Sequence, residues 1–147
     1  MNFRKFSHIL LYALFLLNFQ CFEDDANTDL PDNCGTFALI DSGTFQNGAT
    51  SLYSIIGVDI TDDCMSINFS ATGCDGSTWI MQLIDSGEVQ ETSPPQRSIK
   101  LFLINDEACL AEISAVQIFD LSTLRVEGES EIILNLEGFD EPITYTY

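Results

Sequence analysis

Histidine is almost absent from this chain, and its scarcity removes several kinds of catalytic site. The only histidine, His8, lies near the start of the sequence. The Ser-His-Asp and Cys-His arrangements of nucleophilic enzymes therefore cannot form in the rest of the chain. Lys100 is the only lysine after Lys5, and it lies in an alternating stretch typical of an exposed strand. Phosphate-binding glycine loops are also missing. We expect no enzyme activity and no cofactor.

Basic residues are scarce as well. The chain has five of them against twenty-three acidic residues, which gives a net charge of −18. Affinity for nucleic acid rests on lysine and arginine, so we expect no nucleic-acid partner. The simplest role of the acids is a solvated surface that keeps the protein soluble.

Calcium binding is the alternative interpretation of the acidic residues, because hard cations need convergent oxygen ligands. None of the acidic clusters has EF-hand spacing, and turn or loop roles explain them more simply. We predict no metal site and keep calcium as an alternative. The clusters are Asp59-Asp62-Asp63, Asn105-Asp106-Glu107 and Glu127-Glu129-Glu131.

The apolar run Ile9 to Leu17 is too short to cross a bilayer as a helix, which takes about 20 residues. Arg4 and Lys5 precede it, which is the layout of a secretory signal. The ordinary signal peptidase prefers small residues before its cut, but residues 18–20 are Asn, Phe and Gln. Cys21 follows directly, and the next charged residues are acidic.

This segment resembles a lipobox, in which the cysteine becomes the first residue and carries the lipid. The acids after Cys21 are similar to the surface-export signal of Bacteroidota lipoproteins. The resemblance covers residues 1–25. It implies a signal peptide over 1–20 and a lipid on Cys21. It also implies an anchor in the outer membrane, with the cell surface as a candidate location. Separately, the polar and acidic composition of residues 21–32 indicates a short tether.

Five cysteines are an odd number, and removing Cys21 for the lipid leaves the even set Cys34, Cys64, Cys74 and Cys109. Beyond the inner membrane such cysteines persist as disulfides. A zinc site is disfavoured, because no pair has C-x-x-C spacing and no histidine lies nearby.

Four cysteines allow three pairings. If residues 71–73 form a hairpin turn, Cys64 lies about 20 Å from Cys74 along the strands. A disulfide needs Cα atoms about 5.5 Å apart, which argues against that pair. We favour Cys34–Cys64 with Cys74–Cys109.

Residues 33–147 alternate between apolar and polar side chains with a period of two, which indicates half-buried strands. Short turn signals such as Asp41-Ser42-Gly43 separate them. Only Leu121 to Val126 suggests a short helical turn. Seven to eight antiparallel strands predict a single Ig-like β-sandwich, an all-β fold. The predicted strands are near 36–40, 52–60, 64–70, 77–84, 98–104, 110–119, 130–136 and 142–147.

Two local patterns accompany the strands. The order Cys64, Trp79, Cys109 resembles immunoglobulin domains, where a tryptophan packs on an inter-sheet disulfide. The resemblance implies a shared architecture only. Separately, the five residues Leu39 to Gly43 recur as Leu83 to Gly87, which indicates two similar strand-to-turn corners.

Aromatic residues offer the one sign of a sugar-binding platform. The candidates Trp79, Tyr53, Tyr145 and Tyr147 have apolar neighbours, so core packing is the favoured interpretation. The body resembles small uncharacterised Bacteroidota lipoproteins with a Gly73-Cys74 turn and the segment Phe119 to Leu124, a group that implies no activity.

The sequence therefore predicts a lipid-anchored, non-enzymatic module of the cell envelope, with a structural or protein-interaction role. A glycan-binding accessory protein of polysaccharide uptake is the alternative, together with the calcium-binding surface domain. The partner, whether protein or glycan, and the ligand-binding residues stay unknown at this point.

Overall fold

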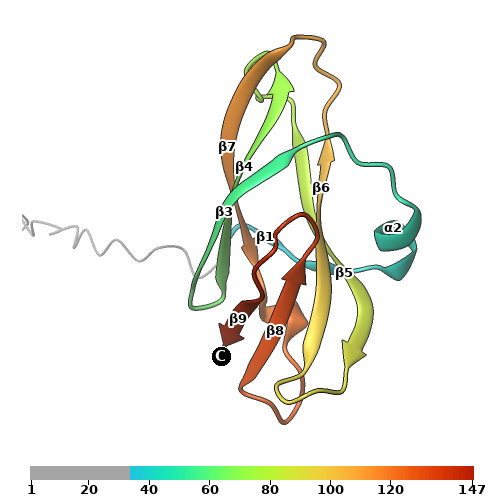
Figure 1. Ribbon diagram of the computed structural model, residues 1–147, viewed down its shortest axis with the longest axis vertical. Coiled ribbons are helices and arrows are strands. Elements are labelled where there is room, and N and C mark those ends of the chain that lie inside the picture. Colours follow the sequence, from blue (N-terminus) through green and yellow to red (C-terminus); the bar gives the residue numbers. More distant parts are fainter. Residues whose placement is uncertain (1–33) are drawn as a thin grey trace, which may run out of the picture. The chain divides into compact units, whose positions relative to one another are not determined.

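The computed structural model describes residues 34–147, which form two stacked β-sheets (Figure 1). The predicted signal peptide, Cys21 and the acidic tether lie outside these residues. The four-stranded sheet has the order β1 (Thr36–Phe37), β7 (Ala111–Asp120), β4 (Cys64–Gly73) and β3 (Ser54–Thr61). The five-stranded sheet has the order β2 (Leu39–Ile40), β5 (Ile80–Gln90), β6 (Gln96–Ile104), β8 (Glu131–Leu136) and β9 (Ile143–Thr146).

Period-two alternation produces the core between the two sheets. On β4, Met65, Ile67 and Phe69 are fully buried, whereas Ser66 and Asn68 are directed outward. The facing strands β6 and β8 alternate in the same way, so that their apolar side chains fill the other half of the core. The predicted all-β sandwich is confirmed, and each predicted strand region contains one or two observed strands.

The sheets are mixed rather than purely antiparallel. A single extended stretch switches sheets, so β1 pairs in parallel with β7 and β2 pairs in parallel with β5. β8 runs parallel to β6, because the chain reverses its direction between β6 and β7 and again between β7 and β8. Such pairings join strands that are far apart in sequence, and alternation alone does not specify them.

The repeated five-residue segment lies at the sheet switch. Its first copy supplies β2 and its second copy lies within β5, and the two run side by side with Leu39 opposite Ile84 and Ile40 opposite Asp85. The two copies are therefore neighbours offset by one residue. The second copy continues as a strand, whereas the first leads into a helix.

The helix α2 (Ser42–Asn47) replaces the turn predicted from Asp41-Ser42-Gly43. Asp41 caps it, since its Oδ1 accepts a hydrogen bond of 3.0 Å from the Thr44 N–H. Asp41 is the sequence signal for this helix. The helix is too short to show an apolar period of its own, so the sequence pattern predicted a turn. The predicted helical turn after β7 is present as the 3-10 helix η2 (Ser122–Leu124). Between residues 34 and 147, no helix has the length and apolar character of a membrane span.

Two disulfides are present, one at each end of β4: Cys34–Cys64 and Cys74–Cys109, with Cα–Cα distances of 5.0 and 4.8 Å. This is the pairing that the sequence favoured, but the predicted hairpin turn at 71–73 was wrong. Those residues extend β4, so Cys64 and Cys74 lie at or beyond opposite ends of one strand.

The immunoglobulin-like order of Cys64, Trp79 and Cys109 does not correspond to a shared contact, because the two cysteines belong to different disulfides. The Trp79 indole packs instead on Phe69, with ring centroids 5.9 Å apart. It also lies against Gly73, where an added Cβ would meet the ring at 2.8 Å. A glycine is therefore required at the end of β4.

Candidate functional site

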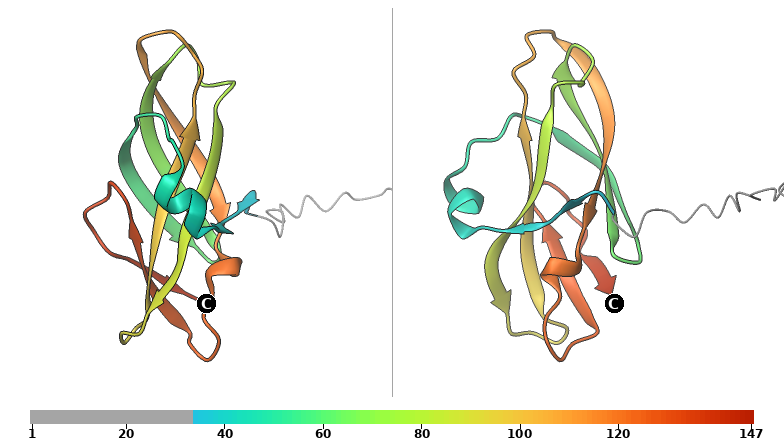
Figure 2. Two further views of the ribbon diagram at one scale, coloured as in Figure 1. Left: turned by 90° about the vertical axis from the view of Figure 1, so that its right-hand side faces the viewer. Right: turned by 180° about the vertical axis from the view of Figure 1, so that it is seen from behind.

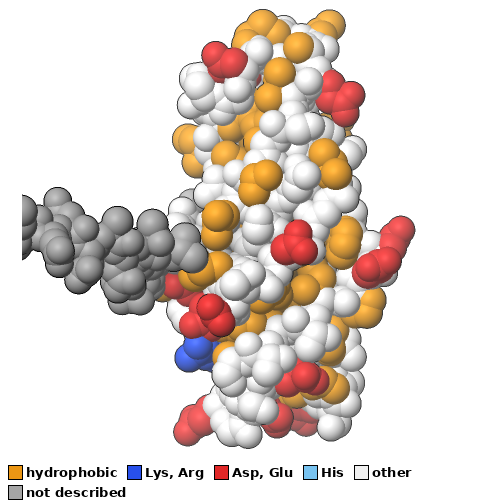
Figure 3. Space-filling model, turned by 90° about the vertical axis from the view of Figure 1, so that its left-hand side faces the viewer, with side chains coloured by type: hydrophobic (Ala, Val, Ile, Leu, Met, Phe, Trp, Pro, Cys, Tyr) orange, Lys and Arg blue, Asp and Glu red, His pale blue; other side chains and the backbone are white. Residues whose placement is uncertain are grey.

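The outer face of the four-stranded sheet carries exposed apolar side chains. We define this outer face by Phe37 of β1, Ile56 of β3, Asn68 of β4, and Val116 and Ile118 of β7. Strand register places Val116 beside Asn68, and Ile56 lies in the bulge next to it. Val116 is 58% exposed and Ile56 is 54% exposed. Figure 3 looks onto this side and shows hydrophobic side chains along its length, with isolated acidic side chains among them.

The middle of the corresponding face of the five-stranded sheet is covered by the chain itself. α2 packs on this sheet, and Ile84 and Phe102 on its outer side are only 1% and 6% exposed. At one end of the same side, the neighbours Ile80 and Ile104 are 56% and 47% exposed. The two views in Figure 2 show α2 standing against this sheet. The fold thus shields the middle of one outer side, whereas Val116 and Ile56 on the other are open to contact.

Every basic side chain of residues 34–147 is engaged within the domain. This part of the chain has three basic and eighteen acidic residues, a net charge of −15. Ion pairs join Arg97 to Asp85 at 2.8 Å, Lys100 to Glu137 at 2.9 Å and Arg125 to Asp63 at 2.6 Å. The charge that remains for a partner is therefore negative.

Lys100, the one lysine of residues 34–147, has a packing role. It lies on β6 beneath α2, where Nζ donates a hydrogen bond of 3.3 Å to the Phe45 carbonyl. The ammonium also lies 5.1 Å from the centre of the Phe45 ring. These contacts attach α2 to the sheet.

Asp63 belongs to a cluster at the end of the sandwich that holds the C-terminal strand. Its carboxylate accepts hydrogen bonds from the Tyr145 hydroxyl and from Arg125 Nη2. The Tyr145 bond, followed by the Arg125 bond, lowers the pKa of Asp63. Burial, together with the bond to Asp63, raises the pKa of Tyr145 to about 12. The cluster ties β9 to the turn after β3.

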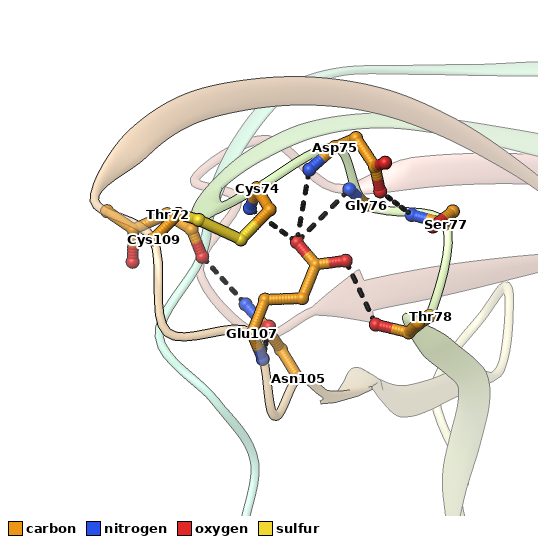
Figure 4. The surroundings of a disulfide bond; sticks show 9 residues. All are labelled: Thr72, Cys74, Asp75, Gly76, Ser77, Thr78, Asn105, Glu107 and Cys109. Atoms are coloured by element: carbon orange, nitrogen blue, oxygen red, sulfur yellow. Dashed lines mark hydrogen bonds between the residues drawn. A yellow bond between two sulfur atoms is a disulfide. The ribbon is translucent and has the colours of Figure 1, made fainter.

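Glu107 organises the opposite end of the sandwich (Figure 4). Its Oε2 accepts hydrogen bonds from the N–H groups of Cys74, Asp75 and Gly76 at 2.5, 3.3 and 3.2 Å. Its Oε1 accepts one from the Thr78 hydroxyl at 2.9 Å. Successive N–H groups directed at one anion form a nest. Here the nest is filled by the protein's own carboxylate, next to the Cys74–Cys109 disulfide.

The pKa of Glu107 follows from these contacts. Partial desolvation raises the pKa, but the hydrogen bonds from Cys74, Gly76, Thr78 and Asp75 outweigh it and lower the pKa to about 2. The ordinary value is 4.5. The contribution of Glu107 to stability is therefore present above pH 4.5 and is lost as the pH falls towards 2.

Replacement of Glu107 by glutamine is expected to lower the melting temperature at pH 7, because the nest then holds a neutral amide. The difference from the wild type should shrink between pH 4.5 and 2, as Glu107 itself becomes protonated. Thermal unfolding followed by circular dichroism at a series of pH values measures this. Glu112→Gln, at an exposed position on β7, is the matched control. A Glu107→Gln difference that stays constant over this pH range would contradict the assignment.

The acidic clusters do not converge. Asp63 is engaged with Arg125 and Tyr145, Glu107 fills the nest, and Asn105 Nδ2 donates to the Thr72 carbonyl. No group of three histidine, cysteine, aspartate or glutamate side chains is arranged for a metal ion within residues 34–147. The calcium alternative gains no support from this geometry.

The candidate sugar-binding aromatics pack inside the sandwich. Trp79 is 7% exposed and Tyr145 is fully buried, while Tyr53 and Tyr147 are half-buried against the core. Phe37 is the one exposed aromatic residue in the part of the chain that the structure describes. A stacking platform needs displayed rings, so the glycan alternative is not favoured by this arrangement.

Two features escaped the sequence analysis. β7 has apolar residues on both faces, with Ile113 and Ala115 inward and Val116 and Ile118 outward. That double pattern was visible in the sequence but was interpreted only as a strand. The buried Arg97–Asp85 pair had no sequence signal, because its members are twelve residues apart on different strands.

Comparison with known proteins identifies the fold without an activity. No protein-family model matches the sequence. No curated protein matches it either. Among solved structures, it is similar to a DUF1344 protein of unknown function from Bacteroides vulgatus, with a TM-score of 0.50 and 14% identity over 76% of this chain and 56% of that chain.

A second solved structure is described as a toxin-related protein from Parabacteroides distasonis. Its TM-score is 0.49 and its identity is 17%, over 76% of this chain and 61% of that chain. This chain therefore spans less than two thirds of the length of either protein. The first similarity concerns the fold alone.

Proposed function

We propose that the protein is a lipid-anchored module of the bacterial cell envelope whose outer face binds a protein partner. The observation that carries the proposal is the contrast between the two sheets. The middle of the outer side of the five-stranded sheet is covered, with Ile84 and Phe102 buried beneath the α2 segment, although Ile80 and Ile104 at one end are exposed. On the other sheet Val116, Ile118 and Ile56 stand exposed. Exposed apolar side chains grouped on one face are typical of interaction sites.

The charge of the domain indicates the chemistry of the partner. With its basic side chains paired internally, the domain offers an apolar face with isolated carboxylates among its side chains. A matching surface is aliphatic and carries lysine or arginine opposite these carboxylates. The two disulfides support a location outside the cytoplasm. We assign no catalytic role, because the domain lacks histidine and its single lysine is engaged beneath α2.

Placing glutamate at both Val116 and Ile118 is expected to weaken partner binding about tenfold or more. Each unpaired carboxylate buried in an interface costs at least about 1.4 kcal/mol, which is a factor of ten in affinity. Chemical cross-linking in intact cells measures the effect as loss of a discrete product whose mass exceeds that of the protein. Both positions are exposed, so the domain itself should stay folded.

Val89→Glu is the matched control, because Val89 is an exposed valine on β5, in the other sheet. It should leave the cross-linked product unchanged. Equal loss in both variants, or no product in the wild type, would refute the proposed function. Retention on a glycan affinity gel that depends on Phe37 would instead favour the glycan alternative.

A further inference from the structure

The edge of β7 is open along most of its length. On one side β7 pairs with β4 from Ala111 to Asp120. On the other side its neighbour is β1, which pairs only with Phe119 and Asp120. In the right-hand view of Figure 2, β1 and β2 cross at mid-height and β7 (orange) continues above them as the margin of the sheet. Residues 111–117 therefore lack a second neighbouring strand within the described part of the chain.

The free backbone groups on this edge can be assigned from the surrounding hydrogen bonds. The Asp120 carbonyl accepts from the Ala38 N–H at 2.9 Å, so Asp120 directs its polar groups away from β4. Antiparallel pairs alternate, and no register shift interrupts β4 and β7. Ser114 and Val116 therefore share this orientation. Their N–H and C=O groups form a row that an additional strand can pair with.

The β7 edge lacks the devices that protect other sheet edges. At the opposite edge of the same sheet, β3 is interrupted by a bulge between Ile55 and Gly57 and carries Asp59 in its middle. In the second sheet the edge strands β2 and β9 have two and four residues. β5 is also unpaired beyond β2, but its free stretch before Ile84 has only four residues, and a register shift follows Asp85. Residues 113–118 of β7 carry no charge and no bulge. Long, regular and uncharged edges are the ones that accept another strand.

We propose that an extended segment of the partner protein adds to β7 as a further strand over residues 111–117. The inference rests on the proposed function and adds the mode of recognition. Apolar side chains on one face of the segment would cover Ile113 and Ala115, which are half-buried at the margin of the core. The other face would lie next to Ser114 and Val116, and a basic residue would pair with Glu112.

Charge favours a partner over a second copy of this chain. Two described domains would bring net charges of −15 together, and their approach is repulsive. A basic segment is instead attracted to the domain. Because Val116 belongs both to the outer face and to β7, the added strand would lie beside the outer face and extend it.

Amide hydrogen exchange on the purified full-length protein tests the proposal. The probe is a synthetic peptide of about nine residues, within the usual range of strand lengths, that alternates valine and threonine and carries two lysines. In the free protein the N–H groups of Ser114 and Val116 should exchange fast, whereas those of Ile113 and Ala115 are bonded to β4. The lysine peptide should slow Ser114 and Val116 about tenfold or more, and a peptide with glutamate in place of lysine should not.

Ser114→Pro removes one N–H that is directed away from β4, so no hydrogen bond to β4 is lost, and edge positions of this kind tolerate proline. It should abolish the protection at Val116, while Ser114→Ala preserves it. Val58→Pro is the control on β3. Thr61 and Cys64 close a two-residue hairpin, so by alternation the Val58 N–H is also directed away from β4. Binding of the peptide should be unchanged in that variant.

Three results would overturn the proposal: no protection at Ser114 and Val116 with the lysine peptide, slow exchange there in the free monomer, or protection that grows with protein concentration. Slow exchange in the monomer would assign the edge to another segment of this chain, and concentration dependence would assign it to a second copy. Suppose that Val116→Glu/Ile118→Glu abolishes the cellular cross-link but Ser114→Pro leaves the peptide's protection of Val116 unchanged. The proposed function would then stand, and strand addition would be wrong.

Discussion

Replacing Asp85 by leucine is expected to lower the free energy of unfolding by about 3–5 kcal/mol, because it leaves a buried guanidinium without its partner. Arg97 Nη1 lies 2.8 Å from Asp85 Oδ1, and the two side chains are 9% and 0% exposed. The Gly87 N–H donates to the same oxygen at 2.8 Å. Urea unfolding followed by fluorescence of Trp79 measures the loss.

The pair itself contributes much less than the loss of one member. Burial raises the pKa of Asp85 despite its bonds to Gly87 and Arg97, so the ionised carboxylate is disfavoured at this site. Asp85 Oδ2 and Arg97 Nε have no hydrogen-bond partner. The double variant Asp85→Leu/Arg97→Met should therefore recover most of the stability. A double variant as unstable as Asp85→Leu alone would show that the ion pair stabilises the sandwich directly.

The second large effect concerns the anchor. Changing Cys21 to serine removes the sulfur that would carry the acyl chains, whose insertion is worth about 0.8 kcal/mol per buried methylene. The protein should move almost completely from the detergent phase to the aqueous phase in a detergent phase-separation assay. Mass spectrometry of the wild-type protein should show a fatty-acylated Cys21 at the amino terminus.

The control for this experiment is Phe22→Ser, which alters the neighbouring residue and keeps the cysteine. It should partition into detergent like the wild type. A Cys21→Ser protein that still enters the detergent phase, or a wild-type protein with an unmodified Cys21, would remove the anchor from the account while leaving the β-sandwich and its outer face unaffected.

Local pattern predicted the strands but not their partners. Alternation on β4 located a strand because Met65, Ile67 and Phe69 share one face, and that property belongs to the segment alone. The parallel pairing of β6 with β8 depends on two chain reversals elsewhere in the sequence. Helix α2 was missed because its cap, Asp41, also fits a turn.

The candidate site was less accessible from sequence than the fold. The parity of the cysteines predicted two disulfides, and the favoured pairing was correct although the hairpin turn used to argue for it does not exist. The exposure of Val116 and Ile118 depends on the absence of a covering element, which no local pattern encodes. The free edge of β7 likewise depends on where β1 begins, because β1 runs parallel to β7 and its two residues pair only with the last two residues of β7.

Site-specific photo-cross-linking in intact cells tests the central claim most directly. A photo-reactive residue replaces Ile118 on the outer face in one variant and the exposed Gln46 of α2 in another. We predict a discrete adduct with a second protein from position 118 and none from position 46. Adducts of equal yield from both positions, or none from position 118, would contradict the view that the outer face binds a protein partner.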